Sequence, residues 1–239
     1  LRSKKGFGTG EFEDLKMMID WAKKTGQRLI QTLPINDTIL YHTNYDSYPY
    51  NAVSVYALHP IYLRPEKIGT IKDKERKAYF EAKKAELNAK TFSDYQNVMN
   101  VKWEYFEEVF ATTSKTVFNS ENYKRFFESN KEWLIPYAAF SYLRDLYKTP
   151  EFGKWPEFSK YRKEEREQLS QPSSDHYQKI AIYYFLQYHL HLQSSEVHDY
   201  ARQNGIAIKG DIPIGVSPRS VDAWVDPELF NTNVQAGAP

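Results

Sequence analysis

The pattern of hydrophobic and polar positions divides this chain of 239 residues into regions of different character. Residues 11–25 carry apolar side chains at i, i+3, i+4 and i+7, which predicts an amphipathic helix that ends at Gly26. Residues 28–35 form a short apolar run, which predicts a buried strand ending at Pro34. Residues 36–62 lack sustained periodicity and are rich in Asn, Asp, Ser, Pro and Tyr, so we expect a long functional loop.

The block 70–177 is dominated by helical patterns. Residues 73–90 are charged with opposite signs at helical spacing, and a helical stripe runs from Met99 to Phe110. A further helix is expected over 132–147. Because a β/α barrel uses only about 30 residues for each strand and its helix, a block of this length predicts an inserted helical subdomain rather than one crossover.

The final third returns to an alternation of helix and strand. Residues 178–204 are apolar on nearly every face, which predicts a buried helix between the barrel and the insertion. Gly205 ends it, and residues 206–216 predict a second buried strand. This strand runs into Gly-Asp-Ile-Pro, which places the carboxylate of Asp211 at its carboxyl end, the end that carries the chemistry in β/α barrels. We therefore predict about three parallel strands.

Composition narrows the classes of partner. The 32 basic and 31 acidic residues give a net charge of +1, so neither a nucleic acid nor an anionic membrane is an expected partner. The chain has no apolar run of about 18 residues and no signal-peptide pattern at its start, so we expect no membrane insertion. It contains no cysteine, which excludes disulfides and is compatible with the cytoplasmic location that we expect.

Aromatic residues make up 16 % of the chain, with 19 Tyr, 14 Phe and 5 Trp. Such a content suits a protein that binds saccharides, because sugar rings stack their C–H faces on aromatic rings. Aromatic side chains also fill cores, and we expect roughly four in five of them to be buried for that reason alone.

Neither a metal nor a nucleotide cofactor is expected. His189 and His191 are two positions apart, so on a helix their side chains point about 200° apart and cannot share an ion. The glycine run from Gly6 to Gly10 lacks both the dinucleotide-binding spacing and the lysine–hydroxyl ending of a phosphate-binding loop. No motif of a serine or cysteine nucleophile is visible.

Three stretches of the sequence resemble the amylomaltases, also called 4-α-glucanotransferases or disproportionating enzymes. They are residues 1–15, residues 31–37 together with 46–63, and residues 205–230. The resemblance implies an α/β fold, namely a partial (β/α)8 (TIM) barrel with a large helical insertion subdomain. On this interpretation residues 1–69 run from the end of strand one to the loop after strand two, 70–177 form the insertion, and 178–239 hold the buried helix, strand three and the following loop.

The resemblance also implies candidate substrate-binding residues. Tyr50 matches a tyrosine that stacks on the sugar ring next to the bond that is cleaved, and Asp211 matches an aspartate that lines the active site. Pro213 would shape that site, and Trp224 would shape the loop after strand three. Each has a structural alternative: a capping role for Asp211, a loop-locking role for Tyr50, and a wall position for Trp224, which we favour over contact with substrate.

Three further polar residues of the first loop receive a structural interpretation. Asp37 follows the first predicted strand, and we expect a loop hydrogen bond rather than contact with substrate. Asp46 and Ser47 precede the tyrosine-rich turn and are expected to support it.

The catalytic residues of the family are not found in this chain. Retaining glycosyl transfer needs two carboxyl groups about 5 Å apart, and the family's motifs for them have no counterpart between positions 1 and 239. We therefore assign no catalytic residue and expect a fragment of an enzyme that transfers α-1,4-glucanosyl units between malto-oligosaccharides, with the remainder of its own barrel as a partner. A non-catalytic α-glucan-binding module and a helical interaction protein are the alternatives.

Overall fold

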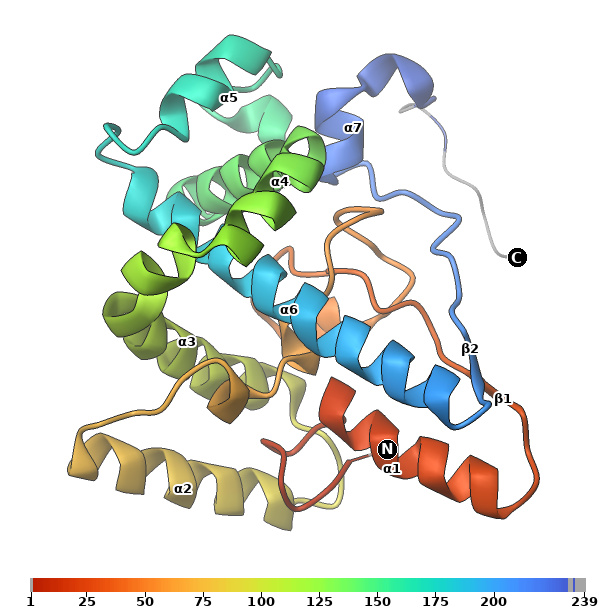
Figure 1. The fold of residues 1–239 in the computed structure, drawn as a ribbon. Helices are drawn as coiled ribbons and strands as arrows, with labels where there is room; N and C mark the ends of the chain where they lie inside the picture. Colours follow the sequence, from red (N-terminus) through yellow and green to blue (C-terminus); the bar gives the residue numbers. More distant parts are fainter. Residues whose placement is uncertain (1, 232–233, 235–239) are drawn as a thin grey trace.

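The structure, a computed structural model, describes residues 2–231 and 234 (Figure 1). Most of its regular structure is helical. The helices are α1 Phe12–Lys24, α2 Lys74–Ala89, α3 Tyr95–Asn119, α4 Glu121–Tyr147, α5 Lys163–Leu169, α6 Tyr177–Gln203 and α7 Val221–Val225, and the strands are β1 Leu29–Gln31 and β2 Ala207–Lys209. The last residues of the predicted third region, 232–233 and 235–239, lie outside the described residues.

The two strands pair in parallel, as the sequence predicts. Leu29 lies opposite Ala207, Gln31 lies opposite Lys209, and the described residues contain no third strand in this sheet. Each strand has three residues, so the predicted strands 28–35 and 206–216 are too long. Pro34 and Pro213 lie within the predicted ranges and have no N–H to donate, so a ladder cannot continue through them.

The predicted helices are present with adjusted bounds. Helix α4 begins at Glu121 rather than near position 132, because Ser120 caps its first turn by accepting a hydrogen bond from the backbone N–H of Tyr123. Pro136 lies inside this helix, as the predicted range 132–147 allows, although a proline usually marks a helix boundary.

Helix α6 lies at the centre of the molecule (Figure 1). It packs against α1, α3, α4 and β2, which explains why residues on nearly every face of it are buried, as predicted. One hydrophobic core contains side chains from α1, the strands, the helical block 70–177 and α7. The division of the chain into barrel and insertion stays a prediction, because the two share this core.

Residues 36–64, which we call the loop segment, lie between β1 and the helical block. They contain two short 3₁₀ turns, Asn44–Ser47 and Pro60–Tyr62, and the isolated β-bridges Asn36–Leu58 and Ala52–Val216, but no strand or α-helix. Much of the loop segment is buried. A buried backbone without a strand or helix partner needs side chains to accept and donate its hydrogen bonds.

Two glutamines of α6 supply part of these bonds. The side-chain amide of Gln187 accepts from the N–H of Leu58 at 2.9 Å and donates to its carbonyl at 2.8 Å. The amide of Gln193 makes the same pair of bonds to Arg64, at 2.8 and 3.1 Å. Both glutamines are at most 4 % exposed. Each glutamine therefore makes, for one residue of the loop segment, the two backbone hydrogen bonds that a neighbouring strand would otherwise make.

The described residues include no helix that is both long and apolar enough to pass through a bilayer.

We predict that Gln187→Met lowers the free energy of unfolding by about 2–5 kcal/mol. Methionine keeps the volume but leaves the N–H and C=O of the half-buried Leu58 without these partners, at about 1–3 kcal/mol each. The exposed Gln178 of the same helix gives the matched control, Gln178→Met, which should change stability by less than about 0.5 kcal/mol. Urea denaturation of the three proteins measures this, and equal losses in the two variants would contradict the role of Gln187.

Candidate functional site

Tyr50 and Asp211 meet at the surface, although they are 161 positions apart in the sequence. The hydroxyl of Tyr50 donates to Oδ2 of Asp211 at 2.8 Å. This hydrogen bond is the main reason why the pKa of Tyr50 is raised above its usual value. The phenol therefore stays protonated and continues to donate its hydrogen bond to Asp211. The ring of Tyr50 is 38 % exposed and lies 5.7 Å from that of Tyr48, between ring centroids. An accessible aromatic ring and a carboxylate therefore share one small area.

Asp211 reaches this position because it follows the carboxyl end of β2. The carbonyl of Lys209, the last residue of β2, accepts from the N–H of Thr32, so the two chains still run together there. The other carboxylate oxygen of Asp211 accepts from the N–H of Ile212 at 2.9 Å. Pro213 is buried two residues further on, whereas Ile212 and Ile214 are 74 % and 91 % exposed. Pro213 thus packs inward and supports the turn that presents Asp211.

Asp37 anchors the start of the loop segment. It is 1 % exposed, and its carboxylate accepts from the hydroxyl of Tyr137 at 2.7 Å and from the N–H of Ile39 at 3.0 Å. Burial raises the pKa of Asp37, while the Arg144 guanidinium and the Tyr137 hydroxyl act in the opposite direction. Arg144 also donates to the carbonyl of Ile39 at 2.5 Å. Asp37 therefore fixes the loop segment to α4, which agrees with the structural interpretation from the sequence.

Asp46 organises the turn before Tyr50. Its carboxylate accepts from the N–H of Tyr41 at 3.0 Å and of Thr43 at 3.3 Å, while the hydroxyl of Thr38 donates to its carbonyl at 2.5 Å. The hydroxyl of Ser47 donates to the carbonyl of Asn44 at 2.7 Å. Both Asp46 and Ser47 therefore support the turn, as expected from the sequence.

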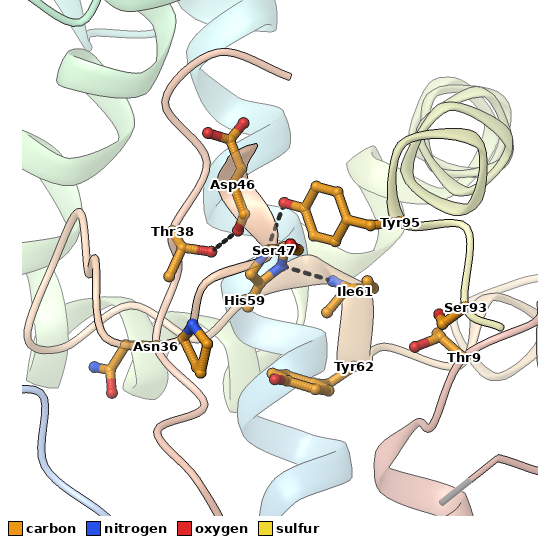
Figure 2. A pocket seen from close by; sticks show the side chains of 11 residues that line it. Thr9, Asn36, Thr38, Asp46, Ser47, His59, Ile61, Tyr62, Ser93 and Tyr95 are labelled. Carbon is orange, nitrogen blue, oxygen red and sulfur yellow. Dashed lines mark hydrogen bonds between the residues drawn. The ribbon is translucent and has the colours of Figure 1, made fainter. Parts of the chain in front are cut away.

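A polar cavity of about 220 Å³ lies beneath this turn (Figure 2). Asp46, Ser47, Pro49, His59 and Tyr95 are among its lining residues, whereas Tyr50 and Asp211 lie outside it. His59 is 3 % exposed, and its Nδ1 accepts from the N–H of Ile61 at 3.0 Å. The neutral ring then carries its hydrogen on Nε2, which donates to the hydroxyl of Tyr95 at 2.9 Å. Burial lowers the pKa of His59 to about 3, so the ring is uncharged at neutral pH.

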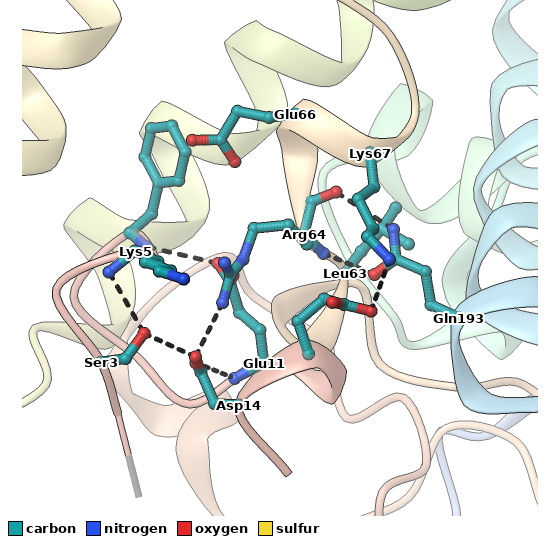
Figure 3. Close-up of polar contacts among 12 residues, drawn as sticks. Ser3, Lys5, Glu11, Asp14, Leu63, Arg64, Glu66, Lys67 and Gln193 are labelled. Atoms are coloured by element: carbon teal, nitrogen blue, oxygen red, sulfur yellow. Dashed lines mark hydrogen bonds and ion pairs between the residues drawn. The ribbon is translucent and has the colours of Figure 1, made fainter. Parts of the chain in front are cut away.

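The end of the loop segment is held by a buried ionic cluster (Figure 3). Arg64 donates to the carboxylates of Glu11 and Asp14, at 2.8 Å in the latter case, and Asp14 also accepts from Ser3. Lys102 of α3 is fully buried, 2.7 Å from Glu11, and donates to the carbonyl of Leu63 at 2.9 Å. Charges in such surroundings persist only when they are paired and hydrogen-bonded. The cluster therefore ties the loop segment to α1 and α3.

A family model described as 4-alpha-glucanotransferase matches residues 1–239. The chain belongs to the 4-alpha-glucanotransferase family. Similar proteins include the 4-alpha-glucanotransferase DPE2 of Oryza sativa subsp. japonica, 42 % identical over 244 residues, and the 4-alpha-glucanotransferase of Chlamydia caviae, 31 % identical over 250 residues. The matches cover all of this chain but 25 % and 44 % of those proteins, so the chain spans less than half the length of either relative.

Solved structures show the same fold. An amylomaltase from Streptococcus agalactiae in complex with acarbose superposes with a TM-score of 0.70 at 22 % identity, over 94 % of this chain and 44 % of that one. An amylomaltase from Corynebacterium glutamicum gives a TM-score of 0.68 at 18 % identity, over 93 % of this chain and 30 % of that one. These structures show a shared fold, while the family that the sequence resembles is confirmed by the family model and the similar sequences.

Trp224 is not available to a glucan in this structure. It is 1 % exposed, and its indole packs against the rings of Phe140, Trp155 and Tyr161. Its Nε1 donates to the carbonyl of Phe158 at 3.0 Å. No ring face of Trp224 is therefore open to a sugar in this structure. Its position agrees with the wall role that the sequence favoured.

The glycine run and the histidines of α6 have packing explanations. Gly8 has φ of +74°, and a Cβ on it would lie 2.8 Å from Leu87, so the run permits a close approach to α2. The ring of His189 packs on Phe185 with centroids 4.4 Å apart, while the ring of His191 packs on Phe126. The part of the chain that the structure describes holds no group of three residues suited to bind a metal.

Sequence reasoning did not single out His59 or Gln187. For Gln187 a signal exists, because it is a polar residue in the otherwise apolar stretch 180–190, where α6 is buried on nearly every face. Such a residue requires a buried hydrogen-bond partner. For His59 the only local signal is its place before Pro60, where its side chain caps the 3₁₀ turn by accepting from the N–H of Ile61. Its burial and its contact with Tyr95 depend on tertiary packing.

We predict that His59 makes stability depend on pH. Its folded pKa of about 3 lies below the value near 6.5 of an unfolded histidine, so between these values only the unfolded chain binds the proton. Stability therefore rises with pH across this window and is lost as pH falls, by up to about 1.4 kcal/mol per pH unit. In His59→Gln this contribution to the slope should vanish, whereas the exposed-residue control His198→Gln should keep it. Urea unfolding at pH 5, 6 and 7 measures the slopes, and a wild-type slope in His59→Gln would refute the assignment.

Proposed function

We propose that the complete protein transfers α-1,4-glucanosyl units between malto-oligosaccharides by a retaining mechanism, and that this chain forms part of its substrate groove. The observation that carries the proposal is the contact between Tyr50 and Asp211 at the carboxyl end of β2, in a chain that belongs to the 4-alpha-glucanotransferase family. Ligands of open α/β sheets and of barrels bind at this edge.

Tyr50 and Asp211 supply the two kinds of contact that a sugar needs. The exposed ring of Tyr50 offers an apolar face on which the C–H groups of a glucosyl ring can stack. The carboxylate of Asp211 accepts hydrogen bonds, at present from Tyr50 and Ile212, and a sugar hydroxyl can add to or replace the first of these. Pro213, buried behind the turn, holds Asp211 in place. We leave Trp224 out of the groove because it is buried.

We assign no catalytic carboxylate to this chain. A retaining mechanism needs a nucleophile and an acid/base about 5 Å apart. The carboxylates of Asp37 and Asp46 accept hydrogen bonds from backbone N–H groups of the loop segment. The carboxylate of Asp222 accepts from the N–H of Val55 at 3.1 Å. The chain covers 25 % and 44 % of the two relatives described above. We infer that the reacting pair comes from the remainder of the same barrel.

The exposed apolar side chains beside the strands support this partial barrel. Leu29 and Leu33 are 50 % and 59 % exposed, and Ile212 and Ile214 are more so. Parallel sheets are normally buried on both faces, so we expect these exposed apolar side chains beside the two strands to be covered by other parts of the protein. Further strands and helices of the complete barrel would cover them.

A non-catalytic α-glucan-binding module is the second candidate, because the same contact between Tyr50 and Asp211 would serve binding alone. Incubation of the complete protein with maltotriose separates the two. Disproportionation gives glucose together with longer oligosaccharides, whereas a binding module returns maltotriose unchanged.

We predict that Tyr50→Ala and Asp211→Asn each weaken the binding of maltotriose by about tenfold, because one aromatic contact or one charged hydrogen bond is worth on the order of 1 kcal/mol or more. The control is Trp21→Ala, which removes an aromatic residue that is 48 % exposed on α1. Isothermal titration calorimetry measures the three affinities. Wild-type affinity in both site variants would contradict the proposed groove.

A further inference from the structure

A second pocket with aromatic walls lies between α4 and α6, where the loop segment crosses these helices. Its volume is about 210 Å³. It is lined by Tyr56, Leu58, Phe126, Asn130, Trp133, Gln187 and His191. We call it the Tyr56 pocket. None of these lining residues is an acid, a lysine or an arginine, and Tyr50 and Asp211 are not among them.

The aromatic wall of the Tyr56 pocket is a stacked pair. The rings of Tyr56 and Trp133 lie 5.9 Å apart between centroids and 18° from parallel. Tyr56 is 61 % exposed, which is high for a large aromatic side chain. Stacking covers one face of its ring against Trp133, while the exposed fraction leaves ring surface accessible to a ligand.

This wall is held in place by bonds within the protein. Nε1 of Trp133 donates to Oδ1 of Asn130 at 3.0 Å, and Nδ2 of Asn130 donates to the carbonyl of Phe126 at 2.7 Å. The N–H of Tyr56 donates to the hydroxyl of Ser54 at 3.2 Å. Gln187, at the base of the pocket, is engaged with Leu58. Both the wall and the base are therefore organised before a ligand arrives, which lowers the entropy lost on binding.

The lining selects a neutral, polar ligand with an apolar face. Burial lowers the pKa of His191, so its ring is uncharged at neutral pH and can donate or accept a hydrogen bond. Asn130 keeps a second amide hydrogen and a carbonyl lone pair free of the two bonds described above. Anions would need a cation in the lining, and cations a carboxylate. A sugar, with C–H faces and hydroxyl groups, meets both requirements.

We propose that the Tyr56 pocket binds glucosyl units of an α-1,4-glucan as a second contact, separate from the area of Tyr50 and Asp211. The identity of the sugar rests on the proposed function, whereas the existence of the pocket does not. Tyr50 and Tyr56 are six residues apart in the loop segment, so their Cα atoms are at most ~20 Å apart. One irregular segment thus presents both contacts.

The test measures binding of maltoheptaose to this chain by isothermal titration calorimetry. The double variant Tyr50→Ala, Asp211→Asn removes the first area and should retain weak binding. Adding Tyr56→Ala to it should lower the remaining affinity by about tenfold, the effect of one aromatic contact. Adding His191→Ala, a second exposed lining residue, should also lower it. Adding Phe92→Ala, which removes a side chain that is 65 % exposed elsewhere, should leave it unchanged.

The outcomes separate this inference from the proposed function. If Tyr50→Ala weakens binding of maltoheptaose while neither Tyr56→Ala nor His191→Ala changes it in any background, the second contact is disproved and the proposed function stands. If the unaltered chain binds no malto-oligosaccharide, both fail. Circular dichroism spectra that match the parent chain confirm that each variant is folded.

Discussion

The structure depends on one constraint: a buried irregular backbone must find hydrogen-bond partners that are not strands. Much of the loop segment is buried, and its carbonyl and N–H groups bond partly to one another and partly to side chains of the surrounding helices. These side chains include Gln187 and Gln193 of α6, Lys102 of α3 and Arg144 of α4. Unpaired, each such group would cost on the order of 1–3 kcal/mol. The helices therefore determine where the loop segment lies.

This constraint links the helical block to the candidate site. Tyr50 lies at the exposed part of a segment whose two ends are fixed, by Asp37 and Tyr137 at the start and by Arg64 with its ionic partners at the end. The buried groups that fix it are either neutral, as His59 is at neutral pH, or paired, as Lys102 is with Glu11. A ring held in this way loses little conformational freedom when a sugar stacks on it.

The sequence predicts those features that depend on local pattern or on the resemblance to the family. The all-round apolar pattern of 178–204 identified α6, and the resemblance named Tyr50 and Asp211 as candidates, which the structure brings into hydrogen-bond contact. It overestimated the length of both strands, because the predicted ranges 28–35 and 206–216 run through Pro34 and Pro213, whereas the pairing stops at Gln31 and Lys209. The setting of Trp224 could not be predicted, because its partners Phe140, Trp155 and Tyr161 come from distant parts of the chain and tertiary packing decides the contact.

The central claim is that the loop segment, held by the helices, and the carboxyl end of β2 together form a contact for a glucan. The most direct test is an experimental structure of this chain with maltotriose bound. We expect a glucosyl ring stacked on Tyr50 with one hydroxyl donating to Asp211, and a loop segment whose bonds to Gln187 and Gln193 are unchanged. The claim would be contradicted if the sugar bound elsewhere and no sugar lay beside the intact hydrogen bond between Tyr50 and Asp211.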